Sequence, residues 1–369
     1  MKNLAKLLWE ALPRYPGQAV SRNNIKFQHK SPSMTFQVRH QSAVTGKRII
    51  ITGGLGQIGQ RLAAHLRAKY GQESVLLTDV KKPTKEVLKD GPYEYADILD
   101  YNQLKRLVVN HGADWLIHFS ALLSAVGEQN VPLAVKVNIN GLHNILNIAN
   151  DFGLRLFVPS TIGAFGVDSP KNPTPDFCIQ RPKTIYGVAK VHAELMGEYY
   201  KERFGLDFRS LRYPGIISAD LQLGGGTTDY AVMMFYHALT SGHFTCGLRP
   251  DTRMPMMHID DCITSTLKFM ETPEEKLKQR VYNISAMSFT PQEISDEIKK
   301  YIPEFQVTYK GNPLLQGIAD SWPDVFEDVN ARRDWGHYHH YDITRLAEFM
   351  MDNFKQQLDL DSSHQRVLS

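Results

Sequence analysis

Tyr186 and Lys190 form the residue pair in this sequence that is best suited to proton transfer. They open a segment, about residues 185–203, whose pattern predicts a helix, and side chains four residues apart share one helix face. An ammonium close to a phenol favours the phenolate, which would let Tyr186 act as a general base near neutral pH. The spacing alone is common, and it also fits a solvated helix face without chemistry.

A hydroxyl group upstream of this pair adds a second chemical function. Thr161 lies 25 residues before Tyr186 and follows an apolar segment, residues 155–159, that we expect to be a strand of a sheet. From the end of that strand, the threonine hydroxyl can donate a hydrogen bond to a substrate oxygen as negative charge grows there. The predicted catalytic set is therefore Tyr186, Lys190 and Thr161.

A glycine-rich turn follows the first apolar strand of the folded body, residues 47–52. Its spacing is GxxGxxG, and a helical pattern from residue 57 to about residue 69 follows at once. Glycines there allow a tight turn and a close approach of backbone to a pyrophosphate, whose charge the helix N-terminus favours. This context predicts dinucleotide binding by Gly53, Gly54, Leu55, Gly56, Gln57, Ile58 and Gly59.

An acidic residue indicates which dinucleotide binds. Asp79 lies 20 residues beyond the last glycine of the turn, at the end of an expected strand, residues 74–79. A carboxylate there accepts hydrogen bonds from the adenosine ribose and repels a 2′-phosphate, which predicts NAD rather than NADP. The nearby Lys81 and Lys82 weaken this preference. Asp97 would meet the adenine, although it also suits a helix N-cap. Val80, Lys81, Ile98 and Ile216 complete the expected cofactor-binding set.

The order of the expected elements indicates the fold class. Helical patterns, including a long one at about 132–152, alternate with apolar strands near residues 47–52, 74–79, 114–119, 155–159 and 209–213. Strands that alternate with helices form a parallel sheet covered on both faces. We therefore expect an α/β protein with a Rossmann-type, doubly wound parallel sheet.

The second half of the chain has too few strands for another such unit. We expect residues 46–215 to form the NAD-binding Rossmann domain and residues 216–355 to form mainly a smaller C-terminal substrate-binding lobe. Within it, residues 258–288 are expected to return to the Rossmann domain. The last predicted helix covers about 343–355, and residues 356–369 are expected to be a polar tail.

Residues 1–45 differ in composition from the rest of the chain. The first 46 residues carry seven basic residues and one acid, whereas the remainder is slightly acidic. Leu4, Leu7, Leu8 and Leu12 fall on one face of a predicted helix. This basic, amphipathic composition is typical of mitochondrial transit peptides and predicts a location in the mitochondrial matrix. A disordered leader is the alternative.

The remaining composition excludes several classes of protein. The chain of 369 residues is 42% hydrophobic and 22% charged, which is ordinary for a globular enzyme and excludes a wholly disordered protein. No apolar run is long enough to cross a membrane. The basic charge is confined to the leader, so no nucleic-acid partner is expected. The three cysteines include no CxxC pair, and His337, His339 and His340 suit a surface cluster, so we expect no metal.

These motifs together resemble the extended short-chain dehydrogenase/reductase family. Residues 52–59 are similar to the family's TGxxGxxG loop, and Thr161 is similar to its Ser or Thr at the end of the fifth strand. Tyr186 and Lys190 resemble its YxxxK pair. The resemblance implies an NAD-dependent enzyme in which Tyr186 is the base and Lys190 binds the nicotinamide ribose.

Two further segments extend the likeness to about residues 46–340. Residues 258–261 resemble the family's HxDD stretch, and residues 331–336 resemble its C-terminal segment. By analogy with the family, the chain is expected to form a homodimer through the helices at about 132–152 and 185–203.

Within the family, residues 120–128, 224–231 and 320–323 resemble the branch that oxidises the C3 hydroxyl of L-threonine. The resemblance implies that this small-molecule substrate is converted to 2-amino-3-oxobutanoate while NAD⁺ becomes NADH. Small polar side chains suit its ammonium and carboxylate, although glycine-rich loops also hold Ser and Thr as turn formers, and a Trp beside a Pro is often plain packing. The expected substrate-binding residues are Ser124, Thr161, Tyr186, Thr227, Thr228, Asp229 and Trp322.

Two other functions remain open at this point. A nucleotide-sugar epimerase or dehydratase would share the fold, the glycine turn and the Tyr–Lys pair, but an epimerase would release no net NADH. A non-catalytic NAD-sensing protein would need only the glycine turn and Asp79. The presence of Thr161, Tyr186 and Lys190 argues against that second alternative.

Overall fold

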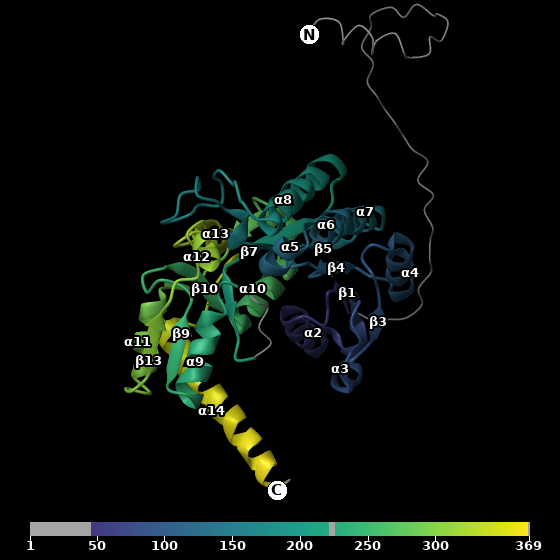
Figure 1. The fold of residues 1–369 in the computed structure, drawn as a ribbon. Helices are drawn as coiled ribbons and strands as arrows, with labels where there is room; N and C mark the ends of the chain where they lie inside the picture. Colours follow the sequence, from purple (N-terminus) through teal and green to yellow (C-terminus); the bar gives the residue numbers. More distant parts are fainter. Residues whose placement is uncertain (1–45, 221–225, 368–369) are drawn as a thin grey trace, which may run out of the picture. The chain divides into compact units, whose positions relative to one another are not determined.

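The computed structural model describes residues 46–220 and 226–367 (Figure 1). The expected leader, residues 1–45, lies outside the described residues, as do residues 221–225 and 368–369. The described residues belong to one compact unit. Among the described helices, none is both long and apolar enough to cross a membrane.

The largest sheet is parallel, with the strand order β3-β2-β1-β4-β5-β7-β11 and with β6 paired to β7. Its strands are β1 (Ile49–Thr52), β2 (Val75–Asp79), β3 (Tyr93–Tyr95), β4 (Trp115–His118), β5 (Arg155–Phe157), β6 (Ser160–Thr161), β7 (Phe208–Tyr213) and β11 (Val281–Asn283). The order reverses between β1 and β4, where the strand ends of such sheets form a crevice for a ligand. This arrangement confirms the predicted Rossmann-type fold.

Alternation along β1 explains how helices cover both faces of the sheet. Ile49 and Ile51 lie in one apolar core, whereas Ile50 lies in another, because successive strand residues point to opposite faces. The first core contains residues of α2 (Gln57–Tyr70) and α10 (Ile259–Glu271). The second contains residues of α4 (Tyr101–His111), α7 (Leu142–Asp151) and α8 (Ile185–Phe204). A short helix, α3 (Lys85–Asp90), lies between β2 and β3.

Two long helical segments appear where the sequence predicts them. Helix α8 begins after Thr184, whose side chain accepts from the Gly187 N–H, and it ends at Gly205 in the left-handed conformation. Helix α6 (Val131–Val135), a π-helical turn at residues 136–141 and α7 form the second segment, which follows α5 (Ser124–Gln129). At Gly141 in this turn, a Cβ would lie 2.6 Å from Ile98 Cδ1, so the glycine permits the close packing.

The C-terminal half contains a smaller lobe with its own core. Its sheets join β8 (Gly215–Ile217), β10 (Met254–His258) and β12 (Met287–Phe289), and separately β9 (His243–Cys246) and β13 (Gln306–Tyr309). Its helices are α9 (Tyr230–Thr240), α11 (Pro291–Lys299), α12 (Pro313–Ala319) and α14 (Ile343–Val367). Helix α13 (Val329–Trp335) packs instead in the sheet core that contains α2, through Ala331 and Trp335. From the expected return segment, residues 258–288, α10 packs on α2 and β11 pairs with β7.

The last helix is longer than the sequence pattern indicates. We expect a helix to about residue 355 and then a polar tail, but α14 continues to Val367. No Gly or Pro interrupts residues 343–367, so nothing in the backbone stops the helix where the apolar pattern ends.

Candidate active site

The glycine turn joins β1 to α2 in a conformation that only glycine allows. Gly53 has φ +67°, and a Cβ on it would lie 2.5 Å from the Ser120 backbone nitrogen. A Cβ on Gly59 would lie 2.9 Å from the carbonyl oxygens of both Gly53 and Gly54. Helix α2 then begins without a side-chain cap. The turn therefore brings bare backbone to the crevice, which fits a bound pyrophosphate.

Asp79 is held against this turn. Its Oδ2 accepts from the Leu55 N–H at 3.2 Å, and its Oδ1 accepts from the Lys81 N–H at 3.1 Å. The Tyr93 hydroxyl donates to the Asp79 carbonyl at 2.9 Å and so fixes the same strand end. The side chain of Val80 is 56% exposed. The carboxylate thus lies between the turn and the end of β2, where a ribose is expected.

The other expected cofactor residues differ in exposure. Asp97 Oδ1 accepts from the Leu99 N–H at 2.9 Å, which is a local turn contact. Ile98 is 5% exposed and belongs to the core under α7, so its side chain faces away from solvent. Ile216 lies in β8 and packs against the core that contains α2.

The three predicted catalytic residues lie together. Lys190 Nζ lies 5.6 Å from the centre of the Tyr186 ring and donates to the Pro159 carbonyl at 2.7 Å. The Thr161 hydroxyl lies close enough to the Tyr186 phenol to favour its ionised form and so to lower its pKa. Thr161 Oγ1 also accepts from the Gly163 N–H at 3.1 Å, which fixes its rotamer. A phenol, a hydroxyl and an ammonium therefore meet at the ends of β6 and α8.

Burial governs the protonation of these groups in the protein without ligand. Burial raises the pKa of Tyr186 to about 12, against the smaller effect of the Thr161 hydroxyl. Burial also lowers the pKa of Lys190 to about 8, against the opposite effect of Glu194. The sequence predicts that Lys190, together with a nicotinamide cation, lowers the tyrosine pKa. In the protein without cofactor, the loss of hydration on burial raises it instead.

Two buried side chains beside this group are missing from the predicted site. His118 ends β4, and its Nδ1 lies 2.7 Å from Thr52 Oγ1. Burial, followed by the charge of Lys190, lowers the pKa of His118 to about 3, so it is neutral. Glu194 lies one helical turn after Lys190 and is 3% exposed. The four-residue spacing could have indicated Glu194, whereas no local pattern indicates His118.

Two of the expected substrate residues lie near the catalytic group. A Cβ on Gly163 would lie 3.5 Å from Thr161 Cγ2 and 3.7 Å from Trp322 Nε1, so the indole is beside the threonine loop. Ser124 is the first residue of α5, which packs against α8. Glu128 in α5 accepts from the Ile185 N–H at 2.7 Å and so fixes α5 at the start of the catalytic helix.

The remaining substrate residues lie beside β8. Thr227 is 5% exposed. Thr228 packs closely on Gly215, because a Cβ on Gly215 would lie 2.8 Å from Thr228 Cγ2. Asp229 Oδ2 accepts from the Gly226 N–H at 2.9 Å. These contacts match the turn-forming alternative as well as a binding role.

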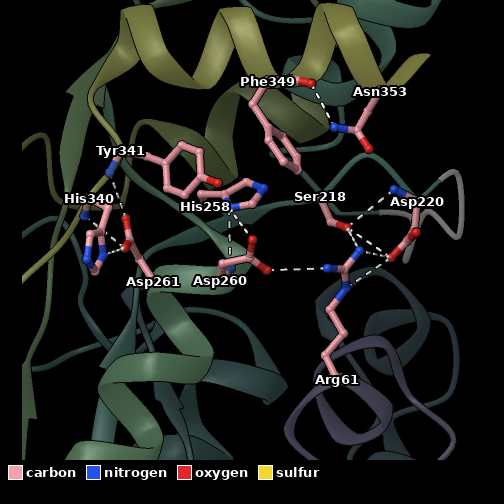
Figure 2. A network of polar contacts seen from close by, with 10 residues as sticks. All are labelled: Arg61, Ser218, Asp220, His258, Asp260, Asp261, His340, Tyr341, Phe349 and Asn353. Atoms are coloured by element: carbon pink, nitrogen blue, oxygen red, sulfur yellow. Dashed lines mark hydrogen bonds and ion pairs between the residues drawn. The ribbon is translucent and has the colours of Figure 1, made fainter. Parts of the chain in front are cut away.

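A polar network connects α2 to the C-terminal half (Figure 2). The Arg61 guanidinium donates to Asp220 Oδ2 at 3.0 Å and to Asp260 Oδ1 at 3.3 Å. His258, which caps α10, accepts from the Asp260 N–H, and its ring lies 4.1 Å from the Tyr341 ring, centre to centre. The cofactor helix, the start of α10 and the segment before α14 therefore share one network.

Of the histidines at 337–340, only His337 departs from the surface cluster that the sequence predicts, because the His340 side chain is 58% exposed. His337 is 3% exposed; its Nε2 lies 2.9 Å from the Ser285 carbonyl, and burial lowers its pKa to about 4. His340 Nδ1 pairs with Asp261 Oδ1 at 3.0 Å. Both rings have structural partners. Within the described residues, no three His, Cys, Asp or Glu side chains could hold a metal ion together.

Comparisons with known proteins agree with this geometry. The model of the NAD-dependent epimerase/dehydratase family matches residues 49–285. The mitochondrial L-threonine 3-dehydrogenase of Bos taurus is 62% identical over 306 residues, which are 83% of this chain and 82% of that protein. The crystal structure of L-threonine dehydrogenase from Phytophthora infestans has 45% identity and a TM-score of 0.81, over 84% of this chain and all of that one. A monomeric L-threonine 3-dehydrogenase from a metagenome has 40% identity and a TM-score of 0.80, over 84% and 99%.

Proposed function

The chain belongs to the NAD-dependent epimerase/dehydratase family, the extended short-chain dehydrogenase/reductase family to which its motifs point, and we propose that it oxidises the C3 hydroxyl of L-threonine. The observation that carries the mechanism is the contact of Tyr186 and Thr161 with Lys190 beside them. NAD⁺, when bound, accepts the C3 hydride, and 2-amino-3-oxobutanoate is the product.

Tyr186 removes the proton of the C3 hydroxyl in this proposal. Thr161 donates to the same substrate oxygen and holds it in line with the phenol. Lys190 contributes its charge to the phenolate and a hydrogen bond to the nicotinamide ribose. Because burial alone raises the pKa of Tyr186 to about 12, the cationic nicotinamide must supply a further part of the stabilisation of the phenolate.

The test is a spectrophotometric assay of the purified protein. NAD⁺ is mixed with L-threonine, 3-hydroxybutyrate or UDP-sugars, and NADH is followed at 340 nm. We expect reduction with threonine only. Absence of NADH with threonine, together with conversion of a UDP-sugar, would establish the epimerase alternative instead.

Cofactor choice is tested at Asp79. The turn favours NAD over NADP, because the Asp79 carboxylate lies beside the glycine backbone and would repel the 2′-phosphate of NADP. We expect Asp79→Ala to narrow the preference for NAD⁺ over NADP⁺ by about tenfold, since roughly one charge–phosphate repulsion is removed. Equal turnover with both cofactors in the unmodified protein would contradict this assignment.

We propose a mitochondrial location, which the composition of the leader and the names of the relatives support. The bovine relative is named as mitochondrial, and residues 1–45 are basic and acid-poor. A fusion of residues 1–45 to a fluorescent protein should enter mitochondria. Diffuse cytosolic fluorescence would show that the leader does not direct import.

A homodimer through α8 is supported by the apolar side chains on that helix. Val188, Leu195 and Tyr199 are 46%, 60% and 53% exposed, and their spacing places them along one face. Because a monomeric relative exists, we expect the decisive measurement to be the mass in solution by light scattering. Leu195→Glu should convert the dimer to a monomer, and a wild-type monomer would refute the proposal.

A further inference from the structure

Three consecutive residues just after β5, Pro159, Ser160 and Thr161, each make one polar contact with α8. The helix residues that they contact lie one turn apart on the same face. The contacts join Pro159 O to Lys190 Nζ at 2.7 Å, Ser160 Oγ to Glu194 Oε1, and Thr161 to Tyr186. We call this arrangement the catalytic ladder; two of its three contacts involve catalytic residues, and the one between them involves Glu194.

The Glu194 carboxylate is fixed on every side. Arg212 donates to Oε2 from Nη2 at 2.7 Å and to Oε1 from Nε at 2.9 Å. Gln180 Nε2 donates to Oε2 at 3.1 Å. Glu194 and Arg212 are 3% and 5% exposed, so the carboxylate is dry as well as rigid. Such a group can hold two elements in register and keep a negative charge in place.

We propose that Glu194 is a positioning residue for the reaction, acting through Lys190 and Ser160 without touching the substrate. The inference rests on the proposed function, in which Tyr186 and Thr161 share the substrate hydroxyl. The contact with Ser160 fixes the strand end that carries Thr161, and helix α8 fixes Tyr186 and Lys190. Glu194 thereby sets the separation of the two groups that must meet one substrate oxygen.

The negative charge of Glu194 also favours the protonated form of Lys190. A buried ammonium tends to lose its proton, and Glu194 opposes that loss at Lys190, whose pKa is about 8. The neighbouring charged and titratable groups lie on several elements around the ladder. They are Tyr186, Lys190 and Glu198 on α8, Arg212 on β7, His118 on β4, and Asp176 and Cys178 on the loop before α8.

The first variant removes the charge and keeps the shape. Glu194→Gln leaves an oxygen that can still accept from Ser160, but it removes the negative charge that favours the protonated lysine and opposes the phenolate. Both the acidic and the alkaline limbs of the kcat/KM profile should therefore move to lower pH, by about one unit. The KM for threonine should change less than the kcat, because the side chain does not touch the substrate.

Two control variants separate charge from position. Glu194→Asp keeps the charge but withdraws the carboxylate by one methylene, so we expect kcat to fall about tenfold while both limbs stay in place. Ser160→Ala removes the contact and keeps both charges, so it should lower kcat several-fold with unmoved limbs. Glu194→Gln leaves Arg212 buried without its partner and can fail to fold. If it does, Glu194→Asp and Ser160→Ala alone test the positioning role of Glu194. Wild-type kcat in both would overturn the proposal.

A binding measurement keeps the inference independent of turnover. The affinity for NAD⁺, followed by quenching of protein fluorescence, should decline on the alkaline side as Lys190 loses its proton. This midpoint should fall by about one pH unit in Glu194→Gln and stay in place in Glu194→Asp. If the wild type does not oxidise threonine, the proposed function fails, and the midpoint still tests Glu194. An identical midpoint in wild type and Glu194→Gln would overturn its role.

Discussion

The catalytic ladder and the network around Arg61 contain similar groups in different surroundings. Glu194 and Arg212 in the ladder are 3% and 5% exposed, and their neighbours are catalytic residues. The side chains of Arg61, Asp220 and Asp260 are 34%, 42% and 39% exposed. Both networks join elements that are distant in sequence through hydrogen bonds and ion pairs. They differ in the exposure of their side chains.

Burial separates the two networks in energy. In the ladder the charged groups are buried, so burial lowers the pKa of Lys190 and the charge of Glu194 opposes that effect strongly. In the Arg61 network, water and salt screen each ion pair, and such pairs contribute about 0–1 kcal/mol. The difference implies that the ladder controls chemistry, whereas the Arg61 network fixes geometry weakly.

The largest effect should come from the end of the ladder that meets the substrate. Tyr186→Phe keeps the ring and removes the group that accepts the proton, so turnover should fall about 10²–10⁴-fold. Binding of NAD⁺, measured by fluorescence, should remain. A variant that keeps most of its activity would remove Tyr186 from the mechanism.

The next effect should come from Thr161. Thr161→Ala removes one donor to the developing oxyanion and should cost about 10²–10³-fold in kcat. Thr161→Ser is the matched control, because it keeps the hydroxyl that contacts Tyr186 and accepts from Gly163. Serine should restore most of the rate; equal losses in both variants would show that the methyl group matters instead.

The buried lysine should make stability depend on pH. The pKa of Lys190 is about 8 in the fold, below its ordinary value of 10.5, so the unfolded chain binds more protons between these values. The free energy of unfolding should therefore gain up to about 3 kcal/mol from this group as pH rises from 8 to 10.5. Tyr186 opposes this only above pH 10, where the unfolded chain ionises first.

Urea unfolding at pH 7.5 and 9.5 measures this contribution. In Lys190→Met the rise with pH should be smaller than in the wild type, because the group that titrates is absent. The NAD-free protein is used, so that the cofactor does not add its own pH dependence. A parallel rise in both proteins would contradict a depressed lysine pKa.

The smallest effect is expected in the Arg61 network. Arg61→Ala should lower the free energy of unfolding by less than about 1 kcal/mol, and the loss should shrink in high salt. The change in kcat should stay within about threefold. A loss as large as that of Thr161→Ala would erase the distinction between the two networks and show that contact between α2 and Asp220 is needed for catalysis.

Local sequence patterns alone predict several features of this structure. The alternation of apolar strands and helices predicts the Rossmann sheet, because each element must bury one face. Glycines at 53, 54, 56 and 59 predict the turn after β1, since a side chain would collide with backbone at Gly53 and Gly59. The four-residue spacing places Tyr186 and Lys190 on one helix face, which the structure confirms.

Only the tertiary structure decided the electrostatics and the partners. Sequence spacing suggests that Lys190 lowers the pKa of Tyr186, yet burial of both groups reverses the outcome in the protein without ligand. The four-residue spacing places Glu194 on the helix face of Lys190, but its partners Ser160 and Arg212 come from β6 and β7, and His118 comes from β4, so only the fold brings these groups together. Hydration is lost only when distant segments pack, so the protonation of a buried group is a property of the fold and not of the motif.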